Sequence, residues 1–417
     1  MSVPETDDIL AALDLSRAEP GRGLLEALFT RFVARVPFET VSKILRHADV
    51  GNPREKPRVP QVFWSDFLEW GAGGTCYARV AAFRHLLLEL GFDCRLAVGK
   101  IEADFDHAAL LVSGGGGEGA EWIADVGFPL PALLPAAPGE FETGLGAVRV
   151  ARGPRGWVVD LLEGVPIGAR RIEIFDAPVP DEEYRERWRA TFREGSKFLS
   201  RVSMRVQREA RVTSYVEGEL RIDDAHTRLA IPLPAPRAAR LEQIFGVDAE
   251  KIARAVALVG EKEEEPSTAS SVPTITAWID VEAPPQLAWE AVASPKGHAA
   301  LLSGVGEASA PQVSADGWRL TVSPPARMGE ISGAPVIEEA RPHPEKRELQ
   351  ILRRAGDSVF ESVWRVELHG GRTHLARTAR VSASPEELLR NDALRGRLAA
   401  ALAVDLVAWS RILGSGL

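Results

Sequence analysis

The feature that most constrains this chain is a glycine-rich loop that leads directly into a long apolar helix. Glycines at positions 71, 73 and 74 permit a sharp backbone turn before Thr75 and Cys76. Beyond them the sequence predicts a helix from about residue 75 to residue 90, which Gly91 terminates. The apolar positions that recur at helical spacing are Val80, Ala81, Phe83, Leu86, Leu87 and Leu90. This pattern places Cys76 in the first helical turn.

The start of a helix is a favourable place for an anion. The first backbone amides of a helix have no partner within the helix, and the helix dipole adds partial positive charge there. A thiolate is stabilised by both effects, and more strongly when an imidazolium is nearby. Cys76 is therefore a candidate nucleophile.

Two further residues downstream complete a possible catalytic set. His107 opens the apolar run 107–113, Asp125 closes the run 120–125, and the segment 114–119 between them predicts a hairpin loop. A hairpin centred on Gly116 places His107 directly opposite Asp125, with Cβ atoms about 4.5–5.5 Å apart. The carboxylate then fixes one imidazole tautomer while the other ring nitrogen faces Cys76. A slip of one residue would put the two side chains on opposite faces of the sheet.

Each of these three residues also has an ordinary structural explanation. A lone cysteine is usually a small buried hydrophobe, and an aspartate beside a glycine is usually a turn residue. A histidine at the start of an apolar strand is often a hydrogen-bonded residue at the edge of the core. Together, and each at the end of a predicted element, the three favour thiol chemistry.

Residues 1–260 resemble the arylamine N-acetyltransferase family, which is related to the transglutaminase-like cysteine enzymes. The matching stretches are 36–39 (Val-Pro-Phe-Glu), 73–76 (Gly-Gly-Thr-Cys), 107–112, 126–128 and, more weakly, 241–247. The resemblance implies an α+β fold with a helical subdomain, a β-barrel subdomain and an α/β lid. It also implies a ping-pong reaction in which the cysteine takes an acyl group from acetyl-CoA and passes it to a small aromatic amine.

The resemblance also implies roles for individual residues. It assigns catalysis to Cys76, His107 and Asp125, and it points to substrate binding by Phe38, Gly127 and Phe128. Acetyl-CoA or another acyl thioester is expected as a co-substrate, and no bound cofactor is expected.

Three departures from the family pattern surround the conserved triad. Ala72 stands where the family has an arginine before the glycine pair, and Pro129 stands where it has a second glycine after the phenylalanine. The acidic and asparagine residues that follow the cysteine in the family correspond to Ala78 and Val80. Because the triad is kept while its support differs, thiol chemistry is expected, and the use of CoA as acyl donor is left open.

A change of composition predicts a second domain. Segment 260–272 is charged, then small and polar, and lacks periodicity, so we interpret it as a linker between domain 1–259 and domain 273–417. In the second domain a strand at 274–281, a short helix at 285–293 and several further strands precede a long helix opened by Ser384. This order resembles the START-like, polyketide-cyclase-like (SRPBCC) helix-grip fold, which implies an apolar ligand cavity. The alternative is that the apolar stripe of the helix only fills a core.

Composition narrows the class of protein. The chain has 417 residues, a formal net charge of −9 and two cysteines. This charge argues against nucleic acid as the main partner, and two cysteines cannot form a disulfide framework. No apolar run reaches membrane-spanning length, and the acidic N-terminus does not resemble a signal sequence. We expect a cytoplasmic protein without a membrane partner, and no metal, because no histidine has metal-ligand spacing.

Three functions remain from the sequence, in order of preference. The first is an acyltransferase that uses Cys76, with an amine and an acyl thioester as its small-molecule partners. The second is a transglutaminase-like thiol hydrolase, in which water takes the acyl group. The third is a binding protein whose first domain is inactive and whose C-terminal domain carries an apolar ligand.

Overall fold

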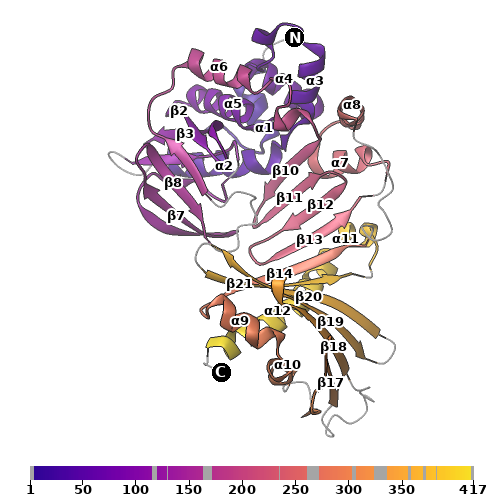
Figure 1. The fold of residues 1–417 in the computed structure, drawn as a ribbon. Coiled ribbons are helices and arrows are strands. Elements are labelled where there is room, and N and C mark those ends of the chain that lie inside the picture. The colour runs from indigo at the N-terminus through magenta and orange to yellow at the C-terminus, as the bar shows by residue number, and fades with distance from the viewer. Residues whose placement is uncertain are drawn as a thin grey trace. The chain divides into compact units, whose positions relative to one another are not determined.

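The chain folds into two units (Figure 1). The computed structural model describes residues 4–114, 120–128, 130–162, 171–233, 235–260, 272–302, 307–323, 336–355, 358–369, 372–381 and 383–414. The first unit comprises Met1–Ala225 and Leu233–Pro266, and the second comprises His226–Pro232 and Ser267–Leu417. Residues 261–271 of the predicted linker lie outside the described residues, so the division 1–259, 260–272 and 273–417 stays a prediction.

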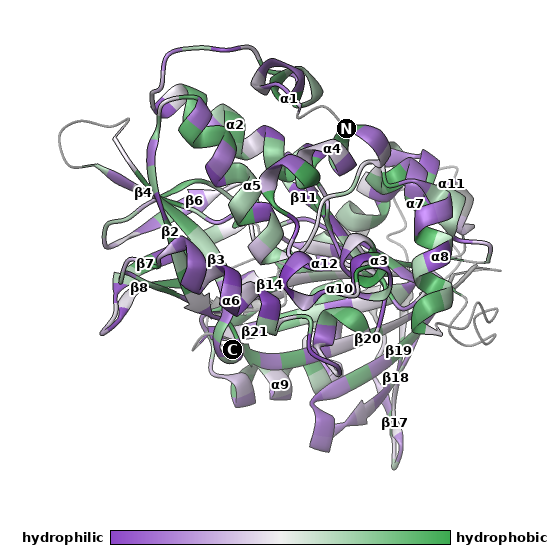
Figure 2. Cartoon of the chain, turned by 90° about the horizontal axis from the view of Figure 1, so that it is seen from above, coloured by the Kyte–Doolittle hydropathy of each residue, from purple (hydrophilic) through white to green (hydrophobic). Residues whose placement is uncertain are grey.

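The first unit begins with a helical part, as the sequence predicts. Buried residues of the second helix recur at positions 25, 28, 29, 32 and 33, the spacing of one helix face. Figure 2 shows that this helix carries both hydrophobic and hydrophilic residues. The elements of this part are α1 (Thr6–Ala12), α2 (Arg22–Arg35), β1 (Phe38–Glu39), α3 (Val41–Asp49), η1 (Pro53–Glu55), α4 (Pro60–Trp70) and α5 (Cys76–Glu89).

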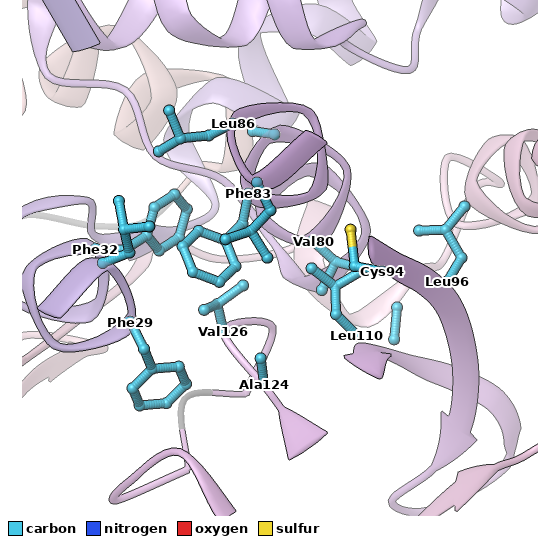
Figure 3. Close-up of a cluster of buried hydrophobic side chains, with 14 of the residues drawn as sticks. Phe29, Phe32, Val80, Phe83, Leu86, Cys94, Leu96, Leu110, Ala124 and Val126 are labelled. Atoms are coloured by element: carbon cyan, nitrogen blue, oxygen red, sulfur yellow. The ribbon is translucent and has the colours of Figure 1, made fainter. Parts of the chain in front are cut away.

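The predicted helix after the glycine-rich loop is confirmed as α5. It begins at Cys76 and ends at Glu89, and Gly91, two residues further on, has the left-handed φ of +82° that favours glycine. Its apolar side chains pack between α2 and the neighbouring sheet (Figure 3). Each large side chain buried there contributes about 1.5–3 kcal/mol of hydrophobic stabilisation. The labelled members of this cluster are Phe29, Phe32, Val80, Phe83, Leu86, Cys94, Leu96, Leu110, Ala124 and Val126.

The strands predicted between residues 92 and 175 form one antiparallel sheet, a nearly closed barrel. The strand order is β5-β4-β3-β2-β9-β8-β7-β6, and a second apolar cluster packs against it. The strands are β2 (Asp93–Lys100), β3 (Asp104–Ser113), β4 (Glu121–Ala124), β5 (Leu134–Pro135), β6 (Gly139–Thr143), β7 (Gly146–Arg152), β8 (Gly156–Leu161) and β9 (Arg171–Phe175).

The rest of the first unit is α/β, in agreement with the expected third subdomain. Strand β1 pairs with β10, which places Phe38 beside Arg205 and joins the N-terminal part to this subdomain. The elements are α6 (Asp181–Ala190), η2 (Lys197–Leu199), β10 (Ser203–Arg208), β11 (Arg211–Val216), β12 (Glu219–Asp223), α7 (Ala238–Phe245) and α8 (Ala249–Val259).

The second unit is an antiparallel sheet with a long C-terminal helix that packs on β14 and β21. The strand order is β13-β14-β21-β20-β19-β18-β17-β15, with β16 paired to β17. The elements are β13 (Thr227–Pro232), β14 (Thr274–Val281), α9 (Pro285–Ala293), α10 (Pro295–Leu302), β15 (Glu307–Ala308), β16 (Gln312–Ser314), β17 (Gly317–Ser323), β18 (Val336–His343), η3 (Pro344–Lys346), β19 (Glu348–Ala355), β20 (Ser358–His369), β21 (Arg372–Arg380), α11 (Pro385–Arg390) and α12 (Asp392–Gly414).

The prediction of a single long helix at the C-terminus is wrong, because the structure has two helices there, α11 and α12. Ser384 caps the first helix as expected, since its hydroxyl accepts a hydrogen bond from the Glu387 amide at 3.2 Å. Asn391 then leaves helical geometry (φ −124°, ψ 87°) and accepts a hydrogen bond from the Leu394 amide at 2.9 Å. Asparagine is a strong N-cap, so the second helix starts there.

The interior of the second unit contains a chain of buried and half-buried charges. Glu338 on β18 is fully buried, 2.8 Å from His298 Nδ1, and accepts a hydrogen bond from Arg353 Nε at 2.5 Å. Arg353 and Arg377 both donate to Asp405 on α12. Burial alone would raise the pKa of Glu338, but His298 and Arg353 lower it to about 2. The interface between helix and sheet is thus partly ionic, and the apolar cavity expected there stays a prediction.

We predict that Glu338→Gln destabilises the second unit by about 3–5 kcal/mol, because it removes the carboxylate that buried His298 contacts and one of the two carboxylates that pair with Arg353. Urea unfolding would measure the loss. Glu339→Gln is the matched control: that side chain is 43% exposed, its nearest cation is 3.6 Å away, and the expected change is under about 1 kcal/mol. Equal effects of the two substitutions would contradict the prediction.

Candidate active site

The segment at residues 36–39 lies directly against the glycine-rich loop. The Gly74 amide donates to the Pro37 carbonyl at 3.3 Å, and the Glu39 amide donates to the Gly74 carbonyl at 3.2 Å. A Cβ atom on Gly73 would lie 1.7 Å from the Pro37 oxygen, so glycine alone permits this approach. Two stretches distant in sequence therefore fix the backbone that precedes Cys76.

Two buried arginines donate hydrogen bonds to backbone carbonyls of this region. Arg58 donates to the Gly73 carbonyl and, at 2.9 Å, to Asp66. Arg79 is fully buried and donates to the Val126 carbonyl at 2.7 Å and to the Val36 carbonyl. Burial lowers the pKa of Arg79 to about 9. The sequence analysis missed both residues, because arginine ordinarily marks the surface.

His107 and Asp125 form a buried contact. His107 Nε2 lies 2.6 Å from Asp125 Oδ2, and the two side chains are 1% and 0% exposed. The second carboxylate oxygen accepts hydrogen bonds from the Gly127 amide at 3.0 Å and the Phe128 amide at 2.9 Å. Burial by itself would lower the pKa of His107, but the Asp125 carboxylate, and then Cys76, raise it to about 10. The structure therefore favours an imidazolium beside Cys76.

The strand register differs from the predicted one. A hairpin centred on Gly116 would pair Leu110 with Trp122, whereas the structure pairs Leu110 with Ala124. His107 and Asp125 are therefore diagonal neighbours and are not directly opposite. Because side chains alternate with a period of two, a shift of two residues keeps both on the same face. The predicted register was wrong, and the predicted contact was right.

Cys76 is the first residue of α5 and is 6% exposed. Its Sγ lies 3.8 Å from the Asp106 carbonyl oxygen, next to His107 in sequence. The turn after Asp125 packs on it so closely that a Cβ atom on Gly127 would lie 2.9 Å from Cys76 Cβ. The structure thus brings together the three residues that the sequence singled out as a catalytic set.

A buried lysine near Cys76 escaped the sequence analysis. Lys43 on α3 is 5% exposed, and its ammonium lies 5.1 Å from the ring centre of Phe192 and 5.7 Å from that of Phe198. Burial lowers the pKa of Lys43 to about 8, and the charge of Cys76 acts in the opposite direction. No sequence signal distinguishes Lys43 from a surface lysine, since its burial depends on the segment that carries the two phenylalanines.

The residues expected to bind substrate lie around this centre. Phe38 is partly exposed and packs edge-on against Phe198 at 5.5 Å between ring centres. Phe128, also partly exposed, stands edge-on to His107 at 6.4 Å, with the Arg205 guanidinium 5.1 Å from its ring centre. Gly127 is buried against Cys76. Their contact with a substrate stays a prediction.

Three of the residues that depart from the family pattern are buried. Ala72, Ala78 and Val80 are 0%, 5% and 0% exposed. Pro129 lies outside the described residues. Three buried apolar side chains therefore stand where the family pattern has polar ones, and Arg58 brings a guanidinium to the loop from elsewhere in the chain.

Two further searches concern only the described part of the chain. In it, no cluster of three or more histidine, cysteine, aspartate or glutamate side chains is arranged to hold a metal ion. None of its helices combines the length and apolar character needed to cross a membrane.

Comparisons with known proteins agree with this architecture. A family model described as N-acetyltransferase matches residues 23–149. No curated protein matches this chain in sequence. Among solved structures, the arylamine N-acetyltransferase of M. tuberculosis is 20% identical, with a TM-score of 0.52, over 61% of this chain and 98% of that protein.

Two more solved structures give the same result. The arylamine N-acetyltransferase of Mycobacterium abscessus is 22% identical, with a TM-score of 0.54, over 62% of this chain and 96% of that protein. The enzyme of Mycobacterium marinum in complex with CoA is 19% identical, with a TM-score of 0.53, over 60% of this chain and 97% of that protein. These likenesses establish an arylamine N-acetyltransferase-like fold for the matched part of the chain.

We predict that the contribution of His107 to the stability of the protein falls between about pH 6.5 and pH 10, because the folded state keeps a proton on His107 that the unfolded state releases. The raised pKa of His107 contributes stability fully below its ordinary value of 6.5, and this contribution is lost as the pH rises through about 10. Urea unfolding of the wild type and of Asp125→Asn across this range would measure it. The variant should show a flatter pH dependence, and parallel curves would refute the assignment.

We also predict that Lys43→Met slows alkylation of Cys76 by iodoacetamide at neutral pH about fivefold, the factor for roughly 1 kcal/mol of lost attraction. The ammonium of Lys43 is a cation that acts on Cys76. Lys251→Met is the matched control, since its ammonium also lies over an aromatic ring, 5.8 Å from the centre of Trp70. Equal rates in the wild type and both variants would rule out this role for Lys43.

Proposed function

We propose that the first unit is an N-acyltransferase in which Cys76 carries an acyl group from a thioester donor to an amine. The observation that carries the proposal is the buried contact of His107 with Asp125 beside a cysteine that starts a helix. The N-acetyltransferase family match and the fold of the solved relatives support it.

All the protein groups that the proposed reaction needs lie at the site. The Cys76 thiolate attacks the thioester carbonyl, forms a carbon–sulfur bond and expels the donor thiolate, which receives the proton held by His107. In the second step the amine attacks acyl-Cys76, neutral His107 accepts the amine proton, and Cys76 leaves as a thiolate. Asp125 engages Nε2, so Nδ1 is the nitrogen available to Cys76.

Charge that develops on the carbonyl oxygen would be stabilised at the start of α5. The Thr75 side chain makes no cap hydrogen bond, so it does not occupy the first amides of this helix. Backbone donors in such a position typically lower the barrier of acyl transfer by about 2.7–4 kcal/mol each. We assign the oxyanion site to these amides.

Acetyl-CoA is the acyl donor that we propose, with another acyl thioester as the alternative. Support comes from the solved relative that holds CoA. We propose a small aromatic amine as acceptor, in contact with Phe38, Gly127 and Phe128. Both phenylalanine side chains are partly exposed, the backbone of Phe38 pairs with Gly74, and the Phe128 ring lies 6.4 Å from the His107 ring. A cytoplasmic location, expected from cysteine usage, stays a prediction.

Hydrolysis of the transglutaminase-like kind is the second candidate for the same site. The observation in its favour is the apolar character of Ala72, Ala78 and Val80, which removes polar groups that the family keeps around the cysteine. Water would then replace the amine in the second step.

For the second unit we propose a START-like helix-grip domain. Its order of elements and the packing of α12 on β14 and β21 support this class. An apolar ligand beneath α12 would also have to accommodate the buried charge of Glu338 and the half-buried charge of Asp405, which favour a ligand with a polar end.

We predict that brief incubation with acetyl-CoA adds one acetyl group to the wild type and none to Cys76→Ala, as read by intact-mass spectrometry. Cys94→Ala is the matched control: this second cysteine is also buried and unpaired, and burial raises its thiol pKa to about 11, so it stays protonated at neutral pH. The control should be acetylated like the wild type.

Addition of an aromatic amine then separates the two candidate reactions. Faster loss of the acetyl group with amine than with buffer alone indicates transfer, and equal loss indicates hydrolysis. Acetylation that persists in Cys76→Ala would disprove the mechanism, because the nucleophile would lie elsewhere.

A further inference from the structure

A cavity of about 380 Å³ lies in the first unit, apart from the candidate active site. It is enclosed by η1 and the start of α4, by α5, by β2 and by α6, and none of Cys76, His107 and Asp125 lines it. Its α5 side consists of Ala81, Arg84, His85 and Leu88, whose spacing of three and four residues marks one helix face. Figure 1 shows α4, α5 and α6 side by side at this end of the unit.

The lining of this cavity is strongly cationic. It contains Arg54, Arg84, Arg185 and Arg189 against a single acidic residue, Asp181. The whole chain has a formal net charge of −9, so this concentration of arginines runs against the overall composition. An excess of positive charge in a concave site attracts anions.

Two of these arginines are free to bind a ligand. Arg84 is 3.1 Å from Asp181, and Arg189 is 2.5 Å from Glu182. Among the described residues, no side-chain carboxylate lies within ion-pair distance of Arg54 or Arg185. Both are exposed at the rim of the cavity, where a guanidinium can grip a carboxylate or a phosphate with two parallel hydrogen bonds.

Buried nitrogen atoms without acceptors mark the same cavity. Arg84 Nε, His85 Nδ1 and Arg189 Nε are buried without a hydrogen-bond partner in the described part of the chain. All three belong to lining residues. A buried polar group without a partner is costly, so an oxygen-rich ligand in this cavity would relieve that cost.

The floor of the cavity is apolar and aromatic. Tyr184, Trp188 and Leu96 are 2%, 4% and 5% exposed, and the two rings are 6.4 Å apart. The volume falls in the range of about 300–1,000 Å³ that is typical of small-molecule sites. An apolar floor beneath a cationic rim suits a molecule with an apolar body and an anionic end.

We propose that this cavity binds a small organic anion, an aromatic ring or a short acyl chain that bears a carboxylate or a phosphate. The ring lies on Trp188 and Tyr184, and the anionic group is held by Arg54 and Arg185. Tyr184 also donates its hydroxyl to the Tyr77 carbonyl at 2.8 Å, so the occupant contacts a side chain that is bonded to the first turn of α5. The site does not depend on the acyltransferase proposal.

The first test is calorimetric titration of the full chain with 1-naphthoate, with neutral 1-naphthamide as the uncharged match and ADP as a phosphate source. Saturable binding of naphthoate or of ADP supports the proposal, and the tighter of the two identifies a carboxylate or a phosphate ligand. The amide should bind at least about tenfold more weakly than naphthoate. Absence of saturable binding of both anions up to about 10 mM, or equal binding of the amide, would overturn the proposal.

Substitutions of cavity residues test whether the ligand binds in this cavity. The double variant Arg54→Ala/Arg185→Ala should weaken binding about tenfold, whereas Arg193→Ala, which lines the adjacent groove and not this cavity, should change it less than about twofold. Ala81→Trp fills the cavity from α5 without removing a charge, and it should abolish binding. Unchanged affinity in the double arginine variant, whose exposed side chains form no ion pair with a described carboxylate, would place the ligand elsewhere.

Discussion

The contact between His107 and Asp125 is the interaction on which the arrangement of the candidate site depends. One carboxylate oxygen holds the imidazole at 2.6 Å, and the other binds two backbone amides of the following turn. That turn in turn packs against Cys76 through Gly127. One buried carboxylate therefore fixes the base, the backbone and the space around the sulfur, and its loss would leave a buried cation without a partner.

The elements that carry the site could be predicted from the sequence because their signals are local. The apolar spacing after Cys76 and the glycines around it predict α5, and the apolar run after His107 predicts β3. The register between β3 and β4 could not be predicted. Residues 114–117 are all glycine, so no side chain marks which of them lies at the centre of the turn.

The burial of charged side chains could not be predicted from the sequence. Lys43, Arg58 and Arg79 are of residue types that usually lie on the surface, yet their exposed fractions are 5%, 3% and 0%. Their burial depends on segments that meet only in the folded chain, such as residue 36 with residue 79. The same holds in the second unit, where Glu338 shares the inward face of β18 with Ala340, and Arg353 follows Leu349 and Ile351 on the inward face of β19. Charged side chains ordinarily mark the solvent face of a strand.

The path of the chain between the two units has a consequence for any shortened form of the protein. The contiguous stretch 1–259 contains β13, although this strand belongs to the second unit and pairs there with β14, residue Thr227 opposite Ala277 and Ala230 opposite Thr274. A fragment that ends before β14 retains the strand and removes that partner. Its unpaired backbone groups then form an open edge, and such edges recruit strands from other molecules, so the fragment would tend to self-associate.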